Sequence, residues 1–286
     1  MKISNVEVNL YQIPLPRVLT DSTHGVMKDF ALITVEVVCD DYSTGLGYTY
    51  TVSSIGGHSV YELIKRDVVP LLIGQDPLFV EKLWEEMYWH LHFVGRGGLA
   101  SFAMAAVDIA LWDLKANYAK LPLWKLLGGH TDRVKAYAGA IDLQLSIDDL
   151  LAQTESFLQA GFCAIKTKVG HPEHDHDIKR VEALRKALGP DVPLMIDANM
   201  QWDVPQTIYM ANVLQDFGIF WLEEPIIPDD IDGHIRIAQN TRIPIATGEN
   251  LHSLHEFQKM IASGAVDYPE PDVATVGGIT PWMKIA

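Results

Sequence analysis

The chain has 286 residues, of which 48% are hydrophobic and 21% are charged, a balance typical of a folded globular protein. Its formal net charge of -15 argues against a nucleic-acid partner and against an anionic membrane, because both need clustered lysine and arginine. Two distant cysteines, Cys39 and Cys163, do not form a disulfide framework, and no apolar run reaches the length of a membrane span. We therefore expect a cytoplasmic, reducing compartment.

The first 131 residues contain strand patterns followed by helix patterns. Alternation of polar and apolar residues, with many β-branched ones, predicts strands at 3–10, 30–38 and 45–51. Apolar residues at helical spacing then predict helices at 60–72, 78–92 and 99–118. A block of strands followed by a block of helices predicts an α+β domain over residues 1–131.

From residue 132 onward, short apolar strands alternate with amphipathic helices. The expected strands are 134–140, 164–169, 193–199, 220–225, 244–249 and 267–274, and the expected helices are 147–160, 176–188, 205–217, 231–240 and 254–263. Repeated β-α units imply a parallel sheet with helices outside, and an eight-stranded barrel is its most economical closure. Only six strands precede Ala286, whereas a full barrel takes about 250 residues. We therefore expect residues 132–286 to form a partial barrel of a chain that is cut short.

Three acidic residues come near the ends of consecutive predicted strands. Asp197, Glu223 and Glu249 follow one another at intervals of 26 residues. Equal spacing over consecutive β-α units predicts that they lie at one height, on the rim where barrel enzymes have their active sites. Three carboxylates would repel one another unless a cation lay between them, and hard oxygen ligands suit Mg²⁺. The alternative is three unrelated acids that cap helices.

Two lysines, Lys166 and Lys168, lie two positions apart on one predicted strand. Because strand side chains alternate, both lysines face the same side. Two amines inside a barrel need a function or anionic partners, and each disfavours the charge of the other. This pairing would lower the pKa of one lysine toward the range that a general base needs. The alternative is a solvent-facing edge strand, which the apolar neighbours Ala164, Ile165 and Val169 disfavour.

Together, these motifs resemble the mandelate racemase subgroup of the enolase superfamily. The matching segments are Lys-Thr-Lys at 166–168, Asp-Ala-Asn at 197–199, Trp-Leu-Glu-Glu-Pro at 221–225, Thr-Gly-Glu-Asn at 247–250 and Pro-Asp-Val-Ala at 271–274. The N-terminal part, including Asp-Ile-Ala-Leu-Trp-Asp at 108–113, is similar to the capping domain of that family. The resemblance implies an α/β barrel of the (β/α)7β type, incomplete here, with an N-terminal α+β capping domain. In look, the pattern is nearest to the galactarate and talarate type of acid-sugar dehydratase.

The resemblance also implies roles for individual residues of the barrel. Asp197, Glu223 and Glu249 match the Mg²⁺ ligands of the family. Lys168 matches the base, and Lys166 matches the lysine that helps to hold the substrate carboxylate and depresses the pKa of its neighbour.

Other positions match less direct roles. Asn199 and Asn250 match positions beside the metal and the substrate. Asp272 matches the aspartate that orients a histidine on the following strand, yet none of the eleven histidines comes after it. The segment 16–29 and the stretch from residue 48 to 51 resemble mobile capping loops that cover the substrate. His24, Tyr48 and Tyr50 are therefore candidates for substrate contact, with plain surface roles as the alternative.

The resemblance implies Mg²⁺-dependent removal of the proton next to a carboxylate, through an enediolate. Loss of a 3-hydroxyl would then give a 2-keto-3-deoxy acid, so dehydration of an acid sugar is the preferred reaction. Racemisation or epimerisation of a 2-hydroxy acid is the second interpretation, and a non-catalytic, truncated remnant is the third. We expect a small-molecule acid sugar or hydroxy acid as the only partner besides further copies of the chain in a homo-oligomer.

Overall fold

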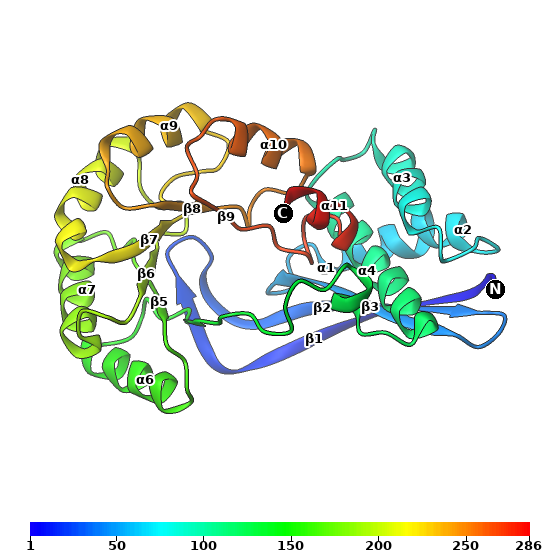
Figure 1. The fold of residues 1–286 in the computed structure, drawn as a ribbon, viewed down its shortest axis with the longest axis horizontal. Coiled ribbons are helices and arrows are strands. Elements are labelled where there is room, and N and C mark those ends of the chain that lie inside the picture. The colour runs from blue at the N-terminus through cyan, green and yellow to red at the C-terminus, as the bar shows by residue number, and fades with distance from the viewer.

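The N-terminal part of the chain folds around an antiparallel sheet. The structure is a computed structural model that describes residues 1–286, and this sheet has the order β1-β2-β3. Its strands are β1 (Ile3–Asp21), β2 (Gly25–Cys39) and β3 (Thr44–Val52). The first two strands continue far beyond the predicted ones. The segment 16–29, expected as a mobile loop, is therefore the far end of a long hairpin (Figure 1).

Helices cover one face of this sheet and confirm the predicted α+β domain. They are α1 (Gly57–Leu63), the π-helical turn η1 (Ile64–Val68), α2 (Val69–Leu72), α3 (Val80–Leu91), α4 (Leu99–Ala119) and α5 (Leu123–Leu126). The longest, α4, lies directly on β3 because Gly47 has no side chain there. A Cβ at Gly47 would come within 2.1 Å of the carbonyl oxygen of Ala106. No helix of the protein combines the length and apolar character needed to cross a membrane.

The second sheet is parallel and has six strands in chain order. They are β4 (Ala138–Gly139), β5 (Ile165–Lys168), β6 (Leu194–Asp197), β7 (Ile219–Glu223), β8 (Ile245–Thr247) and β9 (Tyr268–Pro269). The connecting helices are α6 (Ile147–Gln159), α7 (His174–Leu188), α8 (Val204–Leu214) with the 3₁₀ turn η2 (Gln215–Phe217), α9 (Ile231–Asn240) and α10 (Leu254–Ala262), and α11 (Ile279–Ile285) follows β9. Figure 1 shows the sheet curving inside an arc formed by helices α6 to α10, which confirms the predicted partial barrel.

The two outer strands are much shorter than predicted, with two residues each. In β9 the reason is local: the N–H of Glu270 still donates to Thr247, but Pro271 has no N–H to continue the ladder. Asp272, which was predicted to lie on a strand, instead lies in the turn that follows.

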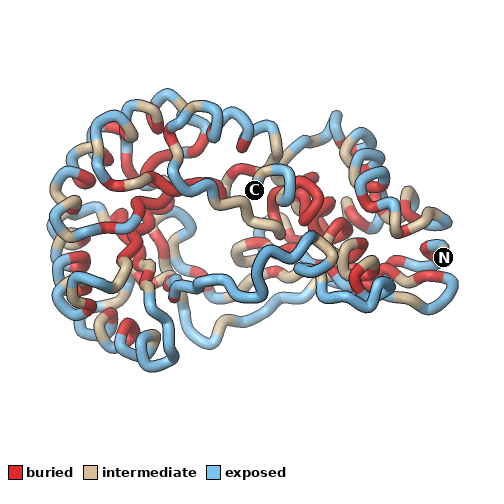
Figure 2. The backbone as a smooth tube through the Cα atoms, in the orientation of Figure 1, coloured by how far each residue is buried: buried red, intermediate tan, exposed pale blue.

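Two separate hydrophobic cores support the two sheets (Figure 2). The predicted division after residue 131 falls in the segment between α5 and β4, and it stays a prediction. A buried polar contact joins the helical side of the first part to the end of the second. The carboxylate of Asp108 accepts hydrogen bonds from the backbone N–H (2.9 Å) and the hydroxyl (2.6 Å) of Thr280.

Candidate active site

Strand pairing brings a lysine and two acids to one level of the parallel sheet. Lys168 on β5 pairs with Asp197 on β6, and Asp197 pairs with Glu223 on β7. All three are the last residues of their strands, so they lie at the carboxyl-terminal edge where barrel enzymes have their sites. All three are buried, with exposed fractions of 6%, 0% and 1%.

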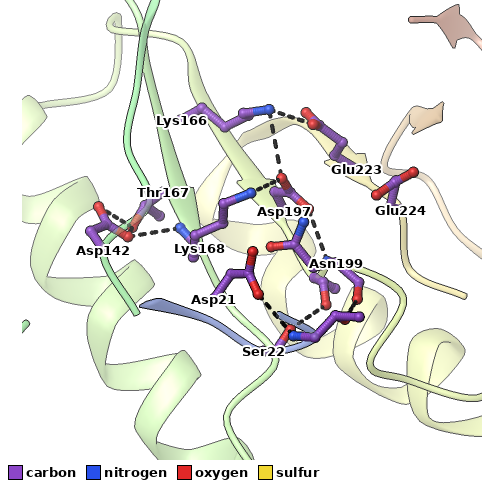
Figure 3. Close-up of polar contacts among 12 residues, drawn as sticks. Asp21, Ser22, Asp142, Lys166, Thr167, Lys168, Asp197, Asn199, Glu223 and Glu224 are labelled. Carbon is purple, nitrogen blue, oxygen red and sulfur yellow. Dashed lines mark hydrogen bonds and ion pairs between the residues drawn. The ribbon is translucent and has the colours of Figure 1, made fainter. Parts of the chain in front are cut away.

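Both predicted lysines face this level and bind the acids directly (Figure 3). The ammonium of Lys168 donates to Asp197 at 2.5 Å, and that of Lys166 donates to Glu223 while lying 3.6 Å from Asp197. The shared orientation expected from strand alternation is therefore present. The solvent-facing alternative is wrong, because only 7% and 11% of the two side chains are exposed.

The pKa of Lys168 differs from the expectation. Burial and the charge of Lys166 both lower it, as predicted, but the carboxylate of Asp197 outweighs them and the pKa is raised. The same balance applies to Asp197. Burial would raise its pKa, but the two ammonium groups hold it below its usual range. The expected lowering of the lysine pKa therefore requires that the charge of Asp197 be neutralised by something else.

Glu249 does not share the level of the other two acids. The register partner of Glu223 is Ala246, so Glu249 lies three residues further on, in the turn after β8, and is solvent-exposed. Gly248 makes this turn with φ 156°, and its missing side chain leaves room for the backbone of Glu270. The equal sequence intervals therefore did not give equal heights. No group of three or more acids, histidines or cysteines is arranged to hold a metal ion, and lysine ammonium groups bind two of the acids, Asp197 and Glu223.

The donor set nevertheless suits a hard divalent cation. Asp197 and Glu223 end adjacent strands, and Glu249 lies in the turn after the next one; carboxylate oxygens of this kind are the ligands that Mg²⁺ prefers. The side-chain oxygen of Asn199 lies beside them, buried and without a hydrogen-bond partner, while its backbone N–H donates to Asp197 at 2.9 Å. A buried oxygen without a donor is costly, and a cation would satisfy it.

A second buried acid follows Glu223 and was not singled out from the sequence. Glu224 is fully buried, and both of its carboxylate oxygens accept from the amide of Asn250, at 2.8 and 3.0 Å. Burial and the charge of Glu249 raise the pKa of Glu224 to about 9. The predicted site residue Asn250 is thus held by a neighbouring carboxyl group.

A buried ion pair that was not predicted from the sequence binds strand β5, which carries the two lysines. Asp142 accepts from the backbone N–H of Lys168 at 3.0 Å and from the hydroxyl of Thr167 (Figure 3). The guanidinium of Arg180 on α7 lies 3.2 Å from Asp142 and is fully buried. Neither residue belongs to a motif, and their sequence separation of 38 gave no signal.

The tip of the β1–β2 hairpin rests on the same edge of the barrel. The hydroxyl of Ser22 donates to the carbonyl oxygen of Ala198 at 2.9 Å, and the hydroxyl of Thr23 donates to that of Asn199. Figure 3 shows Asp21 and Ser22 beside Asn199 and close to Lys168 and Asp197. His24 follows directly, and its ring Nδ1 lies 2.8 Å from the carboxylate of Asp21.

The other candidates for substrate contact lie on β3. The hydroxyl of Tyr50 donates to the carboxylate of Asp272 at 2.8 Å, and Asp272 also accepts from the backbone N–H of Ala274. Tyr48, two residues earlier on the same face, is 46% exposed. The structure therefore places Tyr50 and Asp272 together, and substrate contact by His24, Tyr48 and Tyr50 stays a prediction.

Comparison with known proteins identifies the class. The model of the mandelate racemase / muconate lactonizing enzyme N-terminal domain matches residues 6–128, and that of the enolase C-terminal domain-like region matches residues 149–286. The chain belongs to the mandelate racemase and muconate lactonizing enzyme family of the enolase superfamily.

Two curated relatives match nearly the whole chain. A 3,6-anhydro-alpha-L-galactonate cycloisomerase of Streptomyces coelicolor is 51% identical over 99% of this chain and 78% of its own length. An L-talarate/galactarate dehydratase of Salmonella typhimurium is 38% identical over 99% of this chain and 72% of its own length.

Solved structures agree with these relatives. A structure of a racemase from Streptomyces coelicolor with bound magnesium has a TM-score of 0.98 and 50% identity, covering 99% of this chain and 79% of that one. An L-talarate dehydratase from Polaromonas, complexed with magnesium and L-glucarate, has a TM-score of 0.89 and 39% identity over 99% of this chain and 76% of that one.

Proposed function

We propose that the chain removes the proton next to the carboxylate of an acid sugar and expels the oxygen on C3, giving a 2-keto-3-deoxy acid. One observation carries this proposal: the buried Lys168 and the largely buried Lys166 face two buried acids at the carboxyl-terminal ends of adjacent strands. Buried charges of this density are expensive for stability and cluster at functional sites. Family membership and the dehydratase relatives support the same reaction.

We assign the residues as follows. Asp197, Glu223 and Glu249 would hold Mg²⁺, with Asn199 and Asn250 beside it. When bound, Mg²⁺ stabilises the negative charge that develops on the substrate carboxylate. Lys168 takes the α-proton as a neutral amine, because the cation would relieve the charge of Asp197 that now raises its pKa. Lys166 remains charged and attracts the substrate carboxylate. Asp272 matches the family position whose aspartate orients a histidine, and we assign it the same role.

The leaving oxygen distinguishes two reactions of the same kind. If it is a hydroxyl, the product has lost water and the reaction is a dehydration. If it is the ether oxygen of a 3,6-anhydro ring, breaking the C3–O bond opens the ring and the mass is unchanged. The 51% identity to a cycloisomerase favours ring opening as a second candidate. Racemisation without loss of oxygen remains the alternative that the magnesium-bound racemase structure favours.

The test uses the whole protein with Mg²⁺, a panel of aldaric, aldonic and 3,6-anhydro-aldonic acids, and D₂O. We expect a 2-keto acid, with a mass loss of water for dehydration and no mass change for ring opening. Exchange of the α-proton without keto acid would identify a racemase or epimerase. If no acid gives either exchange or product, the result would favour the non-catalytic remnant and refute the proposal.

Replacing the base gives the matched test at one residue. Lys168→Ala should lower α-proton exchange on its face of the substrate by at least about 100-fold, because Lys166, the second amine of the site, stays charged in this assignment and cannot take a proton. Lys186→Ala, on the exposed face of α7, is the control and should keep full activity. We also expect the protein to be cytoplasmic and to form a homo-oligomer. Sedimentation of the purified protein would test the oligomeric state.

A further inference from the structure

His24 is the one histidine of the chain whose ring binds a carboxylate. Its Nδ1 lies 2.8 Å from Asp21, whose side chain is only 4% exposed, whereas the His24 side chain is 35% exposed. The backbone N–H groups of Thr23 and His24 also donate to Asp21, at 3.0 and 2.6 Å. Asp21 therefore fixes the ring, sets Nδ1 as the bonded nitrogen and leaves Nε2 free.

Hydrogen bonds fix the hairpin tip that carries the Asp21–His24 pair to the edge of the proposed active site. The two hydroxyls next to it, of Ser22 and Thr23, bind the carbonyl oxygens of Ala198 and Asn199. Those carbonyls directly follow Asp197, and the Asn199 backbone binds the Asp197 carboxylate. Two charges of the site, those of Glu249 and Lys168, both act on the His24 ring.

We infer that His24, oriented by Asp21, is a catalytic acid that gives the Nε2 proton to the C3 oxygen as it leaves. The inference rests on the proposed function and adds a residue that the lysines and metal ligands do not supply. When the C3–O bond breaks, its electron pair goes to oxygen, and an alkoxide or hydroxide is a poor leaving group unless it is protonated. The electrons of the former C2–H bond form the C2–C3 double bond.

The protons balance within the site. Lys168 gains the α-proton and the imidazolium loses one, so the first product is the enol of the keto acid. Ketonisation then places a proton on C3 and releases the enol proton, which restores the neutral amine and the imidazolium. Asp21 makes the protonated ring available, because its hydrogen bond raises the pKa of His24 despite the opposing effect of burial.

The test separates proton removal from departure of the oxygen. His24→Asn should lower keto acid formation by about 100-fold or more, the range of general acid catalysis, while α-proton exchange in D₂O continues. A substrate with fluorine in place of the C3 oxygen needs no acid, so its elimination by His24→Asn should fall less than about 10-fold. His58→Asn, at an exposed position on α1, is the matched control.

The outcomes are decisive. Equal losses for the oxygen and fluorine substrates would mean that His24 only binds or supports the site, and unchanged keto acid formation would mean that it has no role. Both results would overturn the inference. If the wild-type protein itself forms no keto acid, the proposed function fails instead, which the same assay shows before any variant is made.

Discussion

Tyr50 and Asp272 are 222 positions apart, yet the hydroxyl of one donates to the carboxylate of the other at 2.8 Å. The bond joins the third strand of the N-terminal sheet to the end of the barrel. A second hydrogen bond joins the same two segments. The hydroxyl of Thr49, next to Tyr50, donates to the carbonyl oxygen of Ala274, two residues after Asp272, at 2.7 Å. Strand β3 therefore fixes the segment that carries Asp272.

Tyr50→Phe should destabilise the protein by about 1–2 kcal/mol, because it removes one hydrogen bond to a partly buried carboxylate. Urea unfolding measures the change. Tyr11→Phe, at a tyrosine on β1 that is 48% exposed, loses the same atom and should be neutral. An equal effect in both variants would show that the bond to Asp272 has no special weight.

Arg180→Met should cost about 3–5 kcal/mol, because it leaves the carboxylate of Asp142 buried without its charge partner. The exposed Lys186→Met on the same helix is the control. The double variant Arg180→Met with Asp142→Leu should recover part of the loss, since no buried charge then remains unpaired. A double variant less stable than the sum of both single changes would contradict this account.

Asp108→Asn should change how stability depends on pH. Burial raises the pKa of Asp108 to about 7, against 3.8 for the unfolded chain. The folded state therefore keeps the proton longer, and its contribution is full below pH 3.8 and is lost as the pH rises through 7. The loss is at most about 4 kcal/mol. Unfolding free energies at pH 4.5 and 7.5 should differ less in the variant; the same difference in both proteins would exclude Asp108 as the cause.

Mg²⁺ should raise the melting temperature, and EDTA should reverse the effect, because a ligand that binds only the folded state stabilises it. Asp197→Asn should remove most of this response, whereas Glu182→Gln on exposed helix surface should leave it intact. A response that survives Asp197→Asn would place the cation elsewhere. Binding should also lower the pKa of Lys168, which titration with and without Mg²⁺ would detect.

Local patterns predicted much of the barrel half. The two lysines face one way because strands alternate, and the strand ends of Asp197 and Glu223 followed from short apolar runs. The position of Glu249 along its strand was predicted wrongly, because equal spacing in the sequence does not show where each strand ends and its turn begins. Gly248 begins such a turn after the short strand β8.

Long-range contacts could not be predicted in the same way. Prolines at 14 and 16 interrupt the alternation that would have extended β1, and the ladder shifts register there before it continues to Asp21. The Asp142–Arg180 pair and the Glu224–Asn250 bond each depend on which loops the fold brings together. Polar residues of this kind look like ordinary loop or helix surface in a single sequence.

The hairpin tip also has a consequence for how the protein is made. Thr23 binds the backbone at Asn199, so the ribosome must add 176 residues before this contact can form. At ordinary synthesis rates, that wait is roughly ten to thirty seconds. Contacts of such high contact order form slowly, so we expect the two hydrophobic cores to condense first and the tip to dock last. Hydrogen exchange pulsed during refolding would show late protection at residues 20–26.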